Sequence, residues 1–288
     1  MIIVKLKGGL GNQLFQYAFG RKLAIQNNSE LKLDIGESPE AFHKNTARKF
    51  KLDRFNICAS IASQEELNQI KNPYGLLSKV LRAFRFWILK KYNIDFEQEQ
   101  LYVKAPAYLD GFWQTEKYFL DIRPLLLDEL TLKDRLSEAS KHINEMIKTS
   151  HSSASLHVRR GDYISDSKTH KVHGSICTPS YYKEAITALV NHVPLLTFYV
   201  FSDDIEWAKN NLPVPREAVF VSNEGIQDYE ELILMSLCKH HIIANSSFSW
   251  WGAWLNNNPD KIVIAPKKWV NKVPDPHPNI VPDNWIRI

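Results

Sequence analysis

Short apolar runs alternate along this chain with longer stretches in which apolar residues recur at helical spacing. The run at 2–6 (IIVKL) predicts a strand, residues 13–26 predict a helix, and the run at 30–35 (ELKLDI) predicts a second strand. The glycine-rich stretch 8–12 (GGLGN) joins the first strand to the helix as a turn. This order is typical of the start of a βαβ unit.

The alternation resumes after a small, polar stretch at 148–155 (KTSHSSAS), which we interpret as a domain boundary. Apolar runs that predict further strands are SLHVRR from residue 155, TFYVFS (197–202), AVFVS (218–222), HIIAN (241–245) and KIVIAP (261–266). Asp228 and Glu231 form a capping-box pattern before an apolar-rich helix, and a second helix is predicted at 246–255. Residues 120–150 are predicted to be helical, whereas 36–75 are expected to be irregular.

The alternation indicates an α/β protein with two doubly wound domains. We place them at residues 1–150 and 151–288. The last residues are a candidate segment to pack back onto the N-terminal domain. A chain of 288 residues is long for one core and comfortable for two.

Composition and charge exclude several classes of protein. The net charge of +4 is mild, and no dense basic run with interleaved aromatic residues suggests a nucleic-acid-binding protein. Three widely spaced cysteines predict neither a disulfide framework nor a CxxC metal site. The sequence shows no signal-peptide pattern and no long uncharged apolar stretch, so a cytoplasmic protein is expected.

Residues 76–92 (LLSKVLRAFRFWILKKY) combine an apolar helical stripe with five cations and no acid. One interpretation is a surface helix that packs on the core and leaves its cations in water. The other is peripheral contact with an anionic membrane surface, at the inner face of the membrane.

Candidate chemistry is concentrated in the stretch HVRRGDY, which follows an apolar run. His157, Arg159, Arg160 and Asp162 lie within six residues, and Gly161 permits a tight turn. Ligands of open α/β sheets bind at the carboxyl ends of strands, and the arginine fork suits a diphosphate. Strand alternation predicts that one arginine meets the ligand while the other pairs with Asp162. A plain surface ion pair between Arg160 and Asp162 is the alternative.

The GGLGN turn leaves a second hypothesis open. Gly9 and Gly11 resemble the first two glycines of a dinucleotide fingerprint, and Asp34 stands where a ribose-binding acid would stand. Leu14 occupies the place of the third glycine, and Asn12 and Gln13 are unusual there. More generally, glycines followed by a helix N-terminus allow a ligand to approach free N–H groups.

Two later motifs also follow predicted strands. FSDD ends in Asp203 and Asp204, which could accept hydrogen bonds from a guanine or a ribose; it lacks the D-x-D pattern of metal-using sugar transferases. In ANSSFSWWGAWL, one of the residues Asn245, Ser246 and Ser247 should cap the helix, and together they suit a phosphate. The tryptophans at 250, 251 and 254 are expected in the core.

With these motifs in this order, the sequence resembles the α-1,2-fucosyltransferases of glycosyltransferase family 11. The motifs that carry the resemblance are GGLGNQLFQYAFGRKLA, HVRRGDY, FSDD and ANSSFSWWGAWL. The resemblance covers most of the chain and is weakest across 36–105. It implies a GT-B architecture, in which two Rossmann-like domains face each other across a cleft. It also implies inverting transfer of fucose from GDP-β-L-fucose to the 2-hydroxyl of a terminal galactose in a glycan, with no obligatory metal and no cofactor.

The resemblance also implies residue roles. Arg159 would bind the β-phosphate, and His157 would lie near the guanosine. Asp162 and Arg160 would shape the loop, with Arg159 and Asp162 as the catalytic candidates. Asp203 or Asp204 would meet the guanine, and Ser246, Ser247 and Phe248 the phosphates. Gly9, Gly11, Asn12 and Gln13 would face the cleft from the acceptor side.

The catalytic base stays open, because the GGLGNQ loop has no carboxylate and Asp162 and Asp166 are only the nearest acids in the sequence. Two other functions also stay open. One is a nicotinamide-dependent oxidoreductase that uses GGLG and Asp34. The other is a non-catalytic carbohydrate-binding protein that uses the tryptophans.

Overall fold

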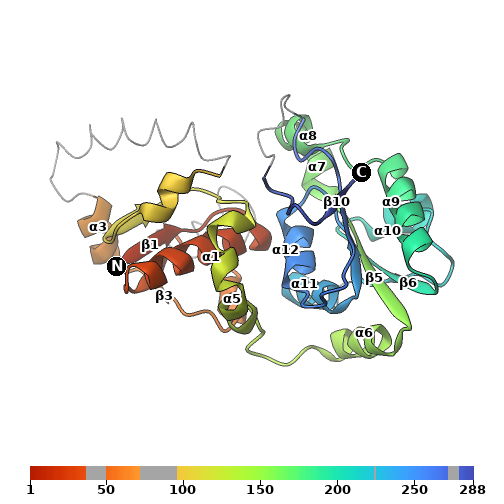
Figure 1. The fold of residues 1–288 in the computed structure, drawn as a ribbon, viewed down its shortest axis with the longest axis horizontal. Helices are drawn as coiled ribbons and strands as arrows, with labels where there is room; N and C mark the ends of the chain where they lie inside the picture. The colour runs from red at the N-terminus through yellow and green to blue at the C-terminus, as the bar shows by residue number, and fades with distance from the viewer. Residues whose placement is uncertain (37–49, 72–95, 224, 272–278) are drawn as a thin grey trace. The chain divides into compact units, whose positions relative to one another are not determined.

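The computed structural model describes residues 1–36, 50–71, 96–223, 225–271 and 279–288 (Figure 1). The basic stretch 76–92 lies outside the described residues. The chain divides into two compact units, Met1–Lys133 and Asp134–Ile288. Each unit is built from helices around a parallel sheet, which confirms the expected fold class. Within the described residues, no helix is both long enough and apolar enough to cross a membrane.

The N-terminal unit contains a four-stranded sheet in the order β3-β2-β1-β4. The strands are β1 (Ile2–Lys5), β2 (Leu31–Asp34), β3 (Ser60–Ile61) and β4 (Ala107–Leu109), and all pairs are parallel. The crossover helix α1 (Leu10–Gln26) begins three positions before the predicted start, with Gly9 as its N-cap. Gly8 has a φ of 81°, so this turn favours glycine.

The rest of the N-terminal unit consists of short helices. These are η1 (Leu52–Arg54), α3 (Gln64–Lys71), η2 (Gln98–Tyr102), η3 (Glu116–Tyr118), η4 (Leu120–Ile122) and α5 (Arg123–Glu129). The expectation that 36–75 is irregular is wrong for β3 and α3. β3 has two exposed residues and α3 buries only Leu67, so neither element carries a hydrophobic pattern strong enough to predict it.

The C-terminal unit contains a six-stranded parallel sheet in the order β10-β9-β8-β5-β6-β7. Its strands are β5 (Ser152–Val158), β6 (Leu196–Ser202), β7 (Val219–Phe220), β8 (His240–Ile242), β9 (Val263–Ala265) and β10 (Ile286–Arg287). The chain runs outward from β5 to β7 and then returns to β8 on the other side of β5. Loops that leave β5 and β8 therefore meet at a topological switch point, where open α/β sheets bind ligands.

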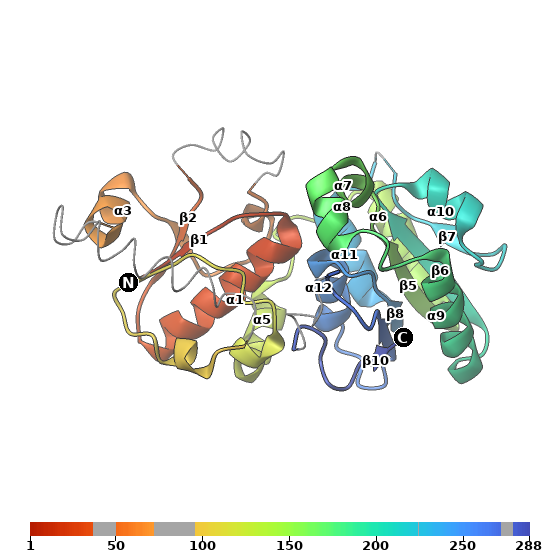
Figure 2. The same cartoon turned by 90° about the horizontal axis from the view of Figure 1, so that it is seen from above.

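Helices cover both faces of this sheet (Figures 1 and 2). α9 (Pro179–His192) and α10 (Ile205–Asn211) cover one face, and α11 (Asp228–Leu237) and α12 (Ser247–Leu255) the other. The short α7 (Gly161–Ser165) and α8 (Ser167–His173) follow β5. The capping box of α11 is formed by Gln227 and Glu230, one position before the predicted pair.

The division between the units precedes the expected boundary at 150/151 because α6 (Glu138–Thr149) packs with the C-terminal unit. Ile147 is buried there in a cluster with Tyr199, Phe201 and Met235. The small, polar stretch 148–155 is not a linker, since β5 already begins at Ser152 and is buried throughout. The last residues form β10, which pairs with β9 of the C-terminal unit.

Candidate functional site

Arg159 lies at the carboxyl end of β5 and is held by two carboxylates. Its Nη2 donates to Asp162 Oδ1 at 2.6 Å, and its Nη1 pairs with Asp203 Oδ2 at 3.0 Å. Burial disfavours the charge, but Asp203 and Asp162 outweigh it and raise the pKa of Arg159. The prediction that Asp162 pairs with Arg160 is wrong, because the first turn of α7 brings Asp162 back toward Arg159.

Arg160 has its own carboxylate partner, Asp204. Its Nε donates to Asp204 Oδ2 at 3.0 Å. The guanidinium carbon lies 3.9 Å from the centroid of the Trp207 ring, which is within range of a cation–π contact. The side chain is thus fixed between a carboxylate and an aromatic ring, both carried by the segment that follows β6.

Asp203 connects the two arginines through the turn between them. Its Oδ1 accepts the backbone N–H of Arg160 at 2.8 Å, while its Oδ2 faces Arg159. A Cβ on Gly161 would lie 2.6 Å from Asp203 Oδ2, closer than such contacts occur. Glycine at 161 therefore lets the carboxylate approach the loop, and the RRGD stretch depends on FSDD for its shape.

His157 is buried at the end of β5, with its ring 5.6 Å from that of Phe248. Its Nδ1 has no hydrogen-bond partner among the described residues. Burial, together with the charge of Arg159, lowers the pKa of His157 to about 3, so the ring is neutral at pH 7. An unpaired buried ring nitrogen is costly, and a bound ligand is one way of pairing it.

The start of α12 lies beside this histidine. Ser246 is the N-cap, as predicted for one residue of this stretch, and its Oγ accepts the N–H of Phe248 at 3.3 Å. Ser247 and Phe248 form the first turn and are partly exposed. Asn245 instead joins two loops, because its Nδ2 donates to the carbonyls of His173 and Trp269. The start of α12 therefore brings the N-terminus of a helix close to His157.

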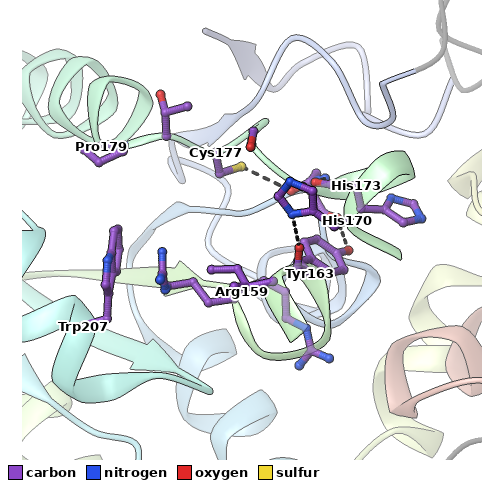
Figure 3. Close-up of a pocket in the computed structure, with 13 residues that line it drawn as sticks. Arg159, Tyr163, His170, His173, Cys177, Pro179 and Trp207 are labelled. Carbon is purple, nitrogen blue, oxygen red and sulfur yellow. Dashed lines mark hydrogen bonds between the residues drawn. The ribbon is translucent and has the colours of Figure 1, made fainter. Parts of the chain in front are cut away.

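A pocket of about 180 Å³ opens on the α7 side of Arg159 (Figure 3). The sequence pointed to Arg159, Arg160 and Asn245 but not to the cavity. The loop between α8 and α9, which contributes Gly174, Ser175, Cys177 and Thr178 to its walls, carries no recognisable motif. Its lining residues include Arg159, Arg160, Tyr163, His173, Cys177, Thr178 and Trp207. Burial raises the pKa of Cys177 to about 12, so this thiol is no nucleophile near pH 7.

The predicted loop residues of the N-terminal unit serve largely to hold their own loop. Gln13 is fully buried; its Nε2 donates to the carbonyl of Gly8 and its Oε1 accepts the N–H of Lys51. Asn12 accepts a hydrogen bond from Gln114 in the segment after β4. Gly9 caps α1, and Gly11 is buried in its first turn.

Asp34 is not available for a ribose. Its side chain is buried and binds Lys71 at 2.8 Å, the Tyr108 hydroxyl at 2.5 Å and the N–H of Gly36 at 2.9 Å. Burial raises the pKa of Asp34, but these partners outweigh it and the net shift is downward. The acid required by a dinucleotide-binding site is thus already satisfied within the fold.

The tryptophans of α12 lie in the core, as expected. Trp250, Trp251 and Trp254 are almost fully buried, so they offer no flat surface to a sugar. Among the described residues no group of three histidine, cysteine, aspartate or glutamate side chains is arranged to hold a metal ion. Asp166, one of the two acids considered as a base, caps α8 by accepting N–H groups from Lys168 and Thr169.

Comparison with known proteins gives a match over the whole chain. A protein-family model described as "Glycosyl transferase family 11" matches residues 1–288. An alpha-1,2-colitosyltransferase of Escherichia coli is 36% identical over 100% of this chain and 99% of its own. Galactoside alpha-(1,2)-fucosyltransferase 2 of Rattus norvegicus is 23% identical over 100% of this chain and 77% of its own.

Solved structures show the same fold. Fucosyltransferase NodZ from Bradyrhizobium superposes with a TM-score of 0.52 at 12% identity, over 88% of this chain and 92% of that one. A structure of NodZ alpha-1,6-fucosyltransferase co-crystallized with GDP gives a TM-score of 0.52 at 14% identity, over 88% and 91% of the two chains. The likeness places the chain in the GT-B fold class.

Proposed function

The chain belongs to glycosyltransferase family 11, and from this premise we propose that it transfers L-fucose from GDP-β-L-fucose to the 2-hydroxyl of a terminal galactose, with inversion. The observation that carries the proposal is the Arg159 fork, held between Asp162 and Asp203 at the end of β5. Beside it lie the unpaired Nδ1 of His157 and the start of α12. These groups suit a diphosphate that leaves with negative charge.

The proposed reaction needs few groups. The 2-hydroxyl oxygen of galactose forms a bond to C1 of fucose, the bond from C1 to the phosphate oxygen breaks, and GDP leaves with the electron pair. Arg159 and the first N–H groups of α12 stabilise the charge on the β-phosphate. Asp162 is bound to Arg159 at 2.6 Å and acts as a positioning residue for it. The acceptor proton passes to water as the bond forms.

The two units divide the substrates in this proposal. The C-terminal unit binds the donor, with Arg160, Asp203 and Asp204 shaping the β5–α7 loop and Ser246, Ser247 and Phe248 beside the phosphates. The N-terminal unit binds the galactoside acceptor, and Gly9, Gly11, Asn12 and Gln13 shape its β1–α1 loop. No cofactor and no obligatory metal take part.

A colitosyl donor is the second candidate. The observation that favours it is the 36% identity to an alpha-1,2-colitosyltransferase along the whole chain. Colitose is fucose without its 3-hydroxyl, so both donors present the same diphosphate to Arg159. The two donor sugars differ only at C3, which carries a hydroxyl group in fucose and none in colitose.

Product analysis tests the proposal. The purified protein is incubated with GDP-fucose or GDP-colitose and a panel of β-galactosides, and the products are identified by mass spectrometry and NMR. The proposal expects an α-1,2-linked product from GDP-fucose. Transfer from GDP-colitose alone would establish the second candidate, and transfer from neither donor, in a protein that also fails to bind GDP, would reject both.

A further inference from the structure

The pocket on the α7 side of Arg159 has walls of two kinds (Figure 3). Arg159, His173 and Thr178 bring polar groups to it, whereas Ile164 and Pro179 are apolar. At about 180 Å³ it is smaller than the roughly 300–1,000 Å³ typical of sites for whole ligands of nucleotide-sugar size. Its size suits one ring of such a ligand.

The charged groups at the pocket are already fixed by ion pairs. Arg159 and Arg160 are the cations of the lining, and three carboxylates, those of Asp162, Asp203 and Asp204, already pair with them. Ser175, Thr178 and Asn245 add uncharged polar groups to the lining. A neutral ring with hydroxyls on one side and an apolar edge on the other fits these walls.

His173 brings unused hydrogen-bonding capacity to the pocket. Its Nδ1 is buried and has no partner among the described residues. The ring stacks on Tyr163, with 5.3 Å between centroids and an angle of 17° between planes. Its backbone carbonyl accepts the Asn245 amide at 3.0 Å. The imidazole is thus fixed in place, on the same tyrosine over which Arg159 lies at 5.8 Å.

The protonation state of His173 agrees with a role in binding hydroxyls. Burial lowers the pKa of the ring, although a hydrogen bond with the Trp269 backbone and the charge of Asp162 act against this. A neutral imidazole has one N–H donor and one nitrogen acceptor. Such a group can bind a sugar hydroxyl but adds no charge to the pocket.

We propose that this pocket receives the 6-deoxyhexosyl ring of the donor and that the His173 imidazole binds a hydroxyl of that ring. The inference rests on the proposed function, because it assumes a GDP-sugar whose diphosphate meets Arg159. It assigns His173 a role in recognising the sugar, separate from the binding of the nucleotide. Ile164 and Pro179 would then face the C6 methyl group.

His173→Phe tests the proposal, because phenylalanine keeps a ring to stack on Tyr163 and removes both nitrogens. Calorimetry should show GDP binding within about twofold of wild type. The kcat/KM with GDP-fucose should fall about 10- to 100-fold, the usual effect of removing one partner of a buried hydrogen bond. His173→Gln, which keeps hydrogen-bonding groups, should recover part of this loss.

His192→Phe is the matched control, since His192 is exposed at the far end of α9. It should leave both GDP binding and kcat/KM unchanged. Equal losses of GDP binding and of kcat/KM in His173→Phe would indicate a structural role and overturn the inference, as would an unchanged kcat/KM. If His173→Phe does not fold, the same comparison is made on His173→Gln. A wild-type protein that does not bind GDP would instead reject the proposed function.

Discussion

One carboxylate, that of Asp203, contacts both residues of the arginine pair. Its Oδ2 lies 3.0 Å from Nη1 of Arg159, and its Oδ1 accepts the backbone N–H of Arg160 at 2.8 Å. The direction of the Arg159 fork is therefore set by a strand that follows it by some forty residues in the chain. A change at Asp203 should act through Arg159.

Asp203→Asn should lower kcat/KM about 10- to 100-fold while the protein stays folded. The amide oxygen can still accept the Arg160 N–H, but the guanidinium of Arg159 loses one of its two anionic partners, and removing one partner of such a pair costs on the order of 1–3 kcal/mol. Glu206→Gln is the control, because Glu206 is exposed and pairs with Lys209 on the surface. Equal kinetics in the two variants would contradict the assignment.

Arg159→Lys should be nearly inactive, with a loss of roughly 10²–10³ in kcat. Two edges of the fork are occupied by Asp162 and Asp203 at the same time, and a single ammonium cannot reproduce that geometry. Steady-state kinetics with GDP-fucose measure the loss, and circular dichroism checks the fold. A lysine variant with near-normal turnover would show that only the charge is needed.

The sequence predicted most of this site because strand ends are easy to find. Apolar runs marked β5, β6 and β8, and parallel strands place their following loops at one edge. The pairing within the site was not predictable. Asp162 follows Arg160 by two residues and Arg159 by three, yet the first turn of α7 brings it to Arg159. Which acid meets which cation depends on three-dimensional positions that no local pattern encodes.

The serines at positions 152, 153 and 155 show a second limit of prediction from the sequence. Small polar residues usually indicate a loop, but here they form the first half of a buried strand. Ser155 is satisfied by His241 and Ser153 by the N–H of Lys239, both across the sheet. Such long-range hydrogen bonds remove the cost of burying a hydroxyl, and they become visible only in the folded chain. These bonds explain why a stretch with the composition of a linker forms a buried strand.

Activity should survive EDTA. In the proposed mechanism, the charge on the departing diphosphate is met by Arg159, by the start of α12 and by the neighbouring neutral His157, and no step is assigned to a metal. Initial rates are measured with GDP-fucose after dialysis against chelator, with and without added Mn²⁺ or Mg²⁺. A modest increase on adding the ion is compatible with faster GDP release. Complete loss of activity on chelation, restored by the ion, would contradict the proposal.

Residues 76–92 predict a weak attraction to anionic membranes. The five cations of this stretch have no acidic neighbour within it, and each contributes about 1 kcal/mol near an anionic surface. Sedimentation with anionic liposomes at low salt should bring down the wild type. A variant that combines Lys79→Glu, Arg82→Glu and Arg85→Glu should stay in the supernatant. Absence of wild-type binding at low salt would reject membrane contact through this stretch.

The fold should lose stability in mild acid because of a buried histidine. The His241 ring lies between Ser155, whose Oγ is 2.8 Å from Nδ1, and Asn256, whose Nδ2 is 2.7 Å from Nε2. The Asn256 amide also donates to the Cys238 carbonyl, while its Oδ1 accepts the N–H of Asn258. Nε2 must then accept, and the ring proton is on Nδ1. Protonation of Nε2 would place its N–H opposite the N–H of the Asn256 amide, and the hydrogen bond between these two nitrogens would be lost.

Burial, aided by Lys261 and His240, lowers the pKa of His241 well below its ordinary value of 6.5. Well above pH 6.5 the ring is neutral in both the folded and the unfolded chain, so it has no effect. As the pH falls below 6.5, only the unfolded chain takes up the proton, and the free energy of unfolding decreases. The steepest decrease that this one group can cause is about 1.4 kcal/mol per pH unit.

Urea unfolding of wild type and His241→Gln between pH 7.5 and 5 measures this effect. His157, His173 and His240 also have lowered pKa values and contribute in the same direction, so the wild-type curve should fall steeply. His241→Gln should be less stable at pH 7.5, because it loses packing, but its pH dependence should be shallower by about one proton. His192→Gln, at an exposed position, should keep the wild-type slope. Equal slopes in His241→Gln and wild type would mean that His241 takes up its proton equally in the folded and unfolded chains, and would contradict a lowered pKa.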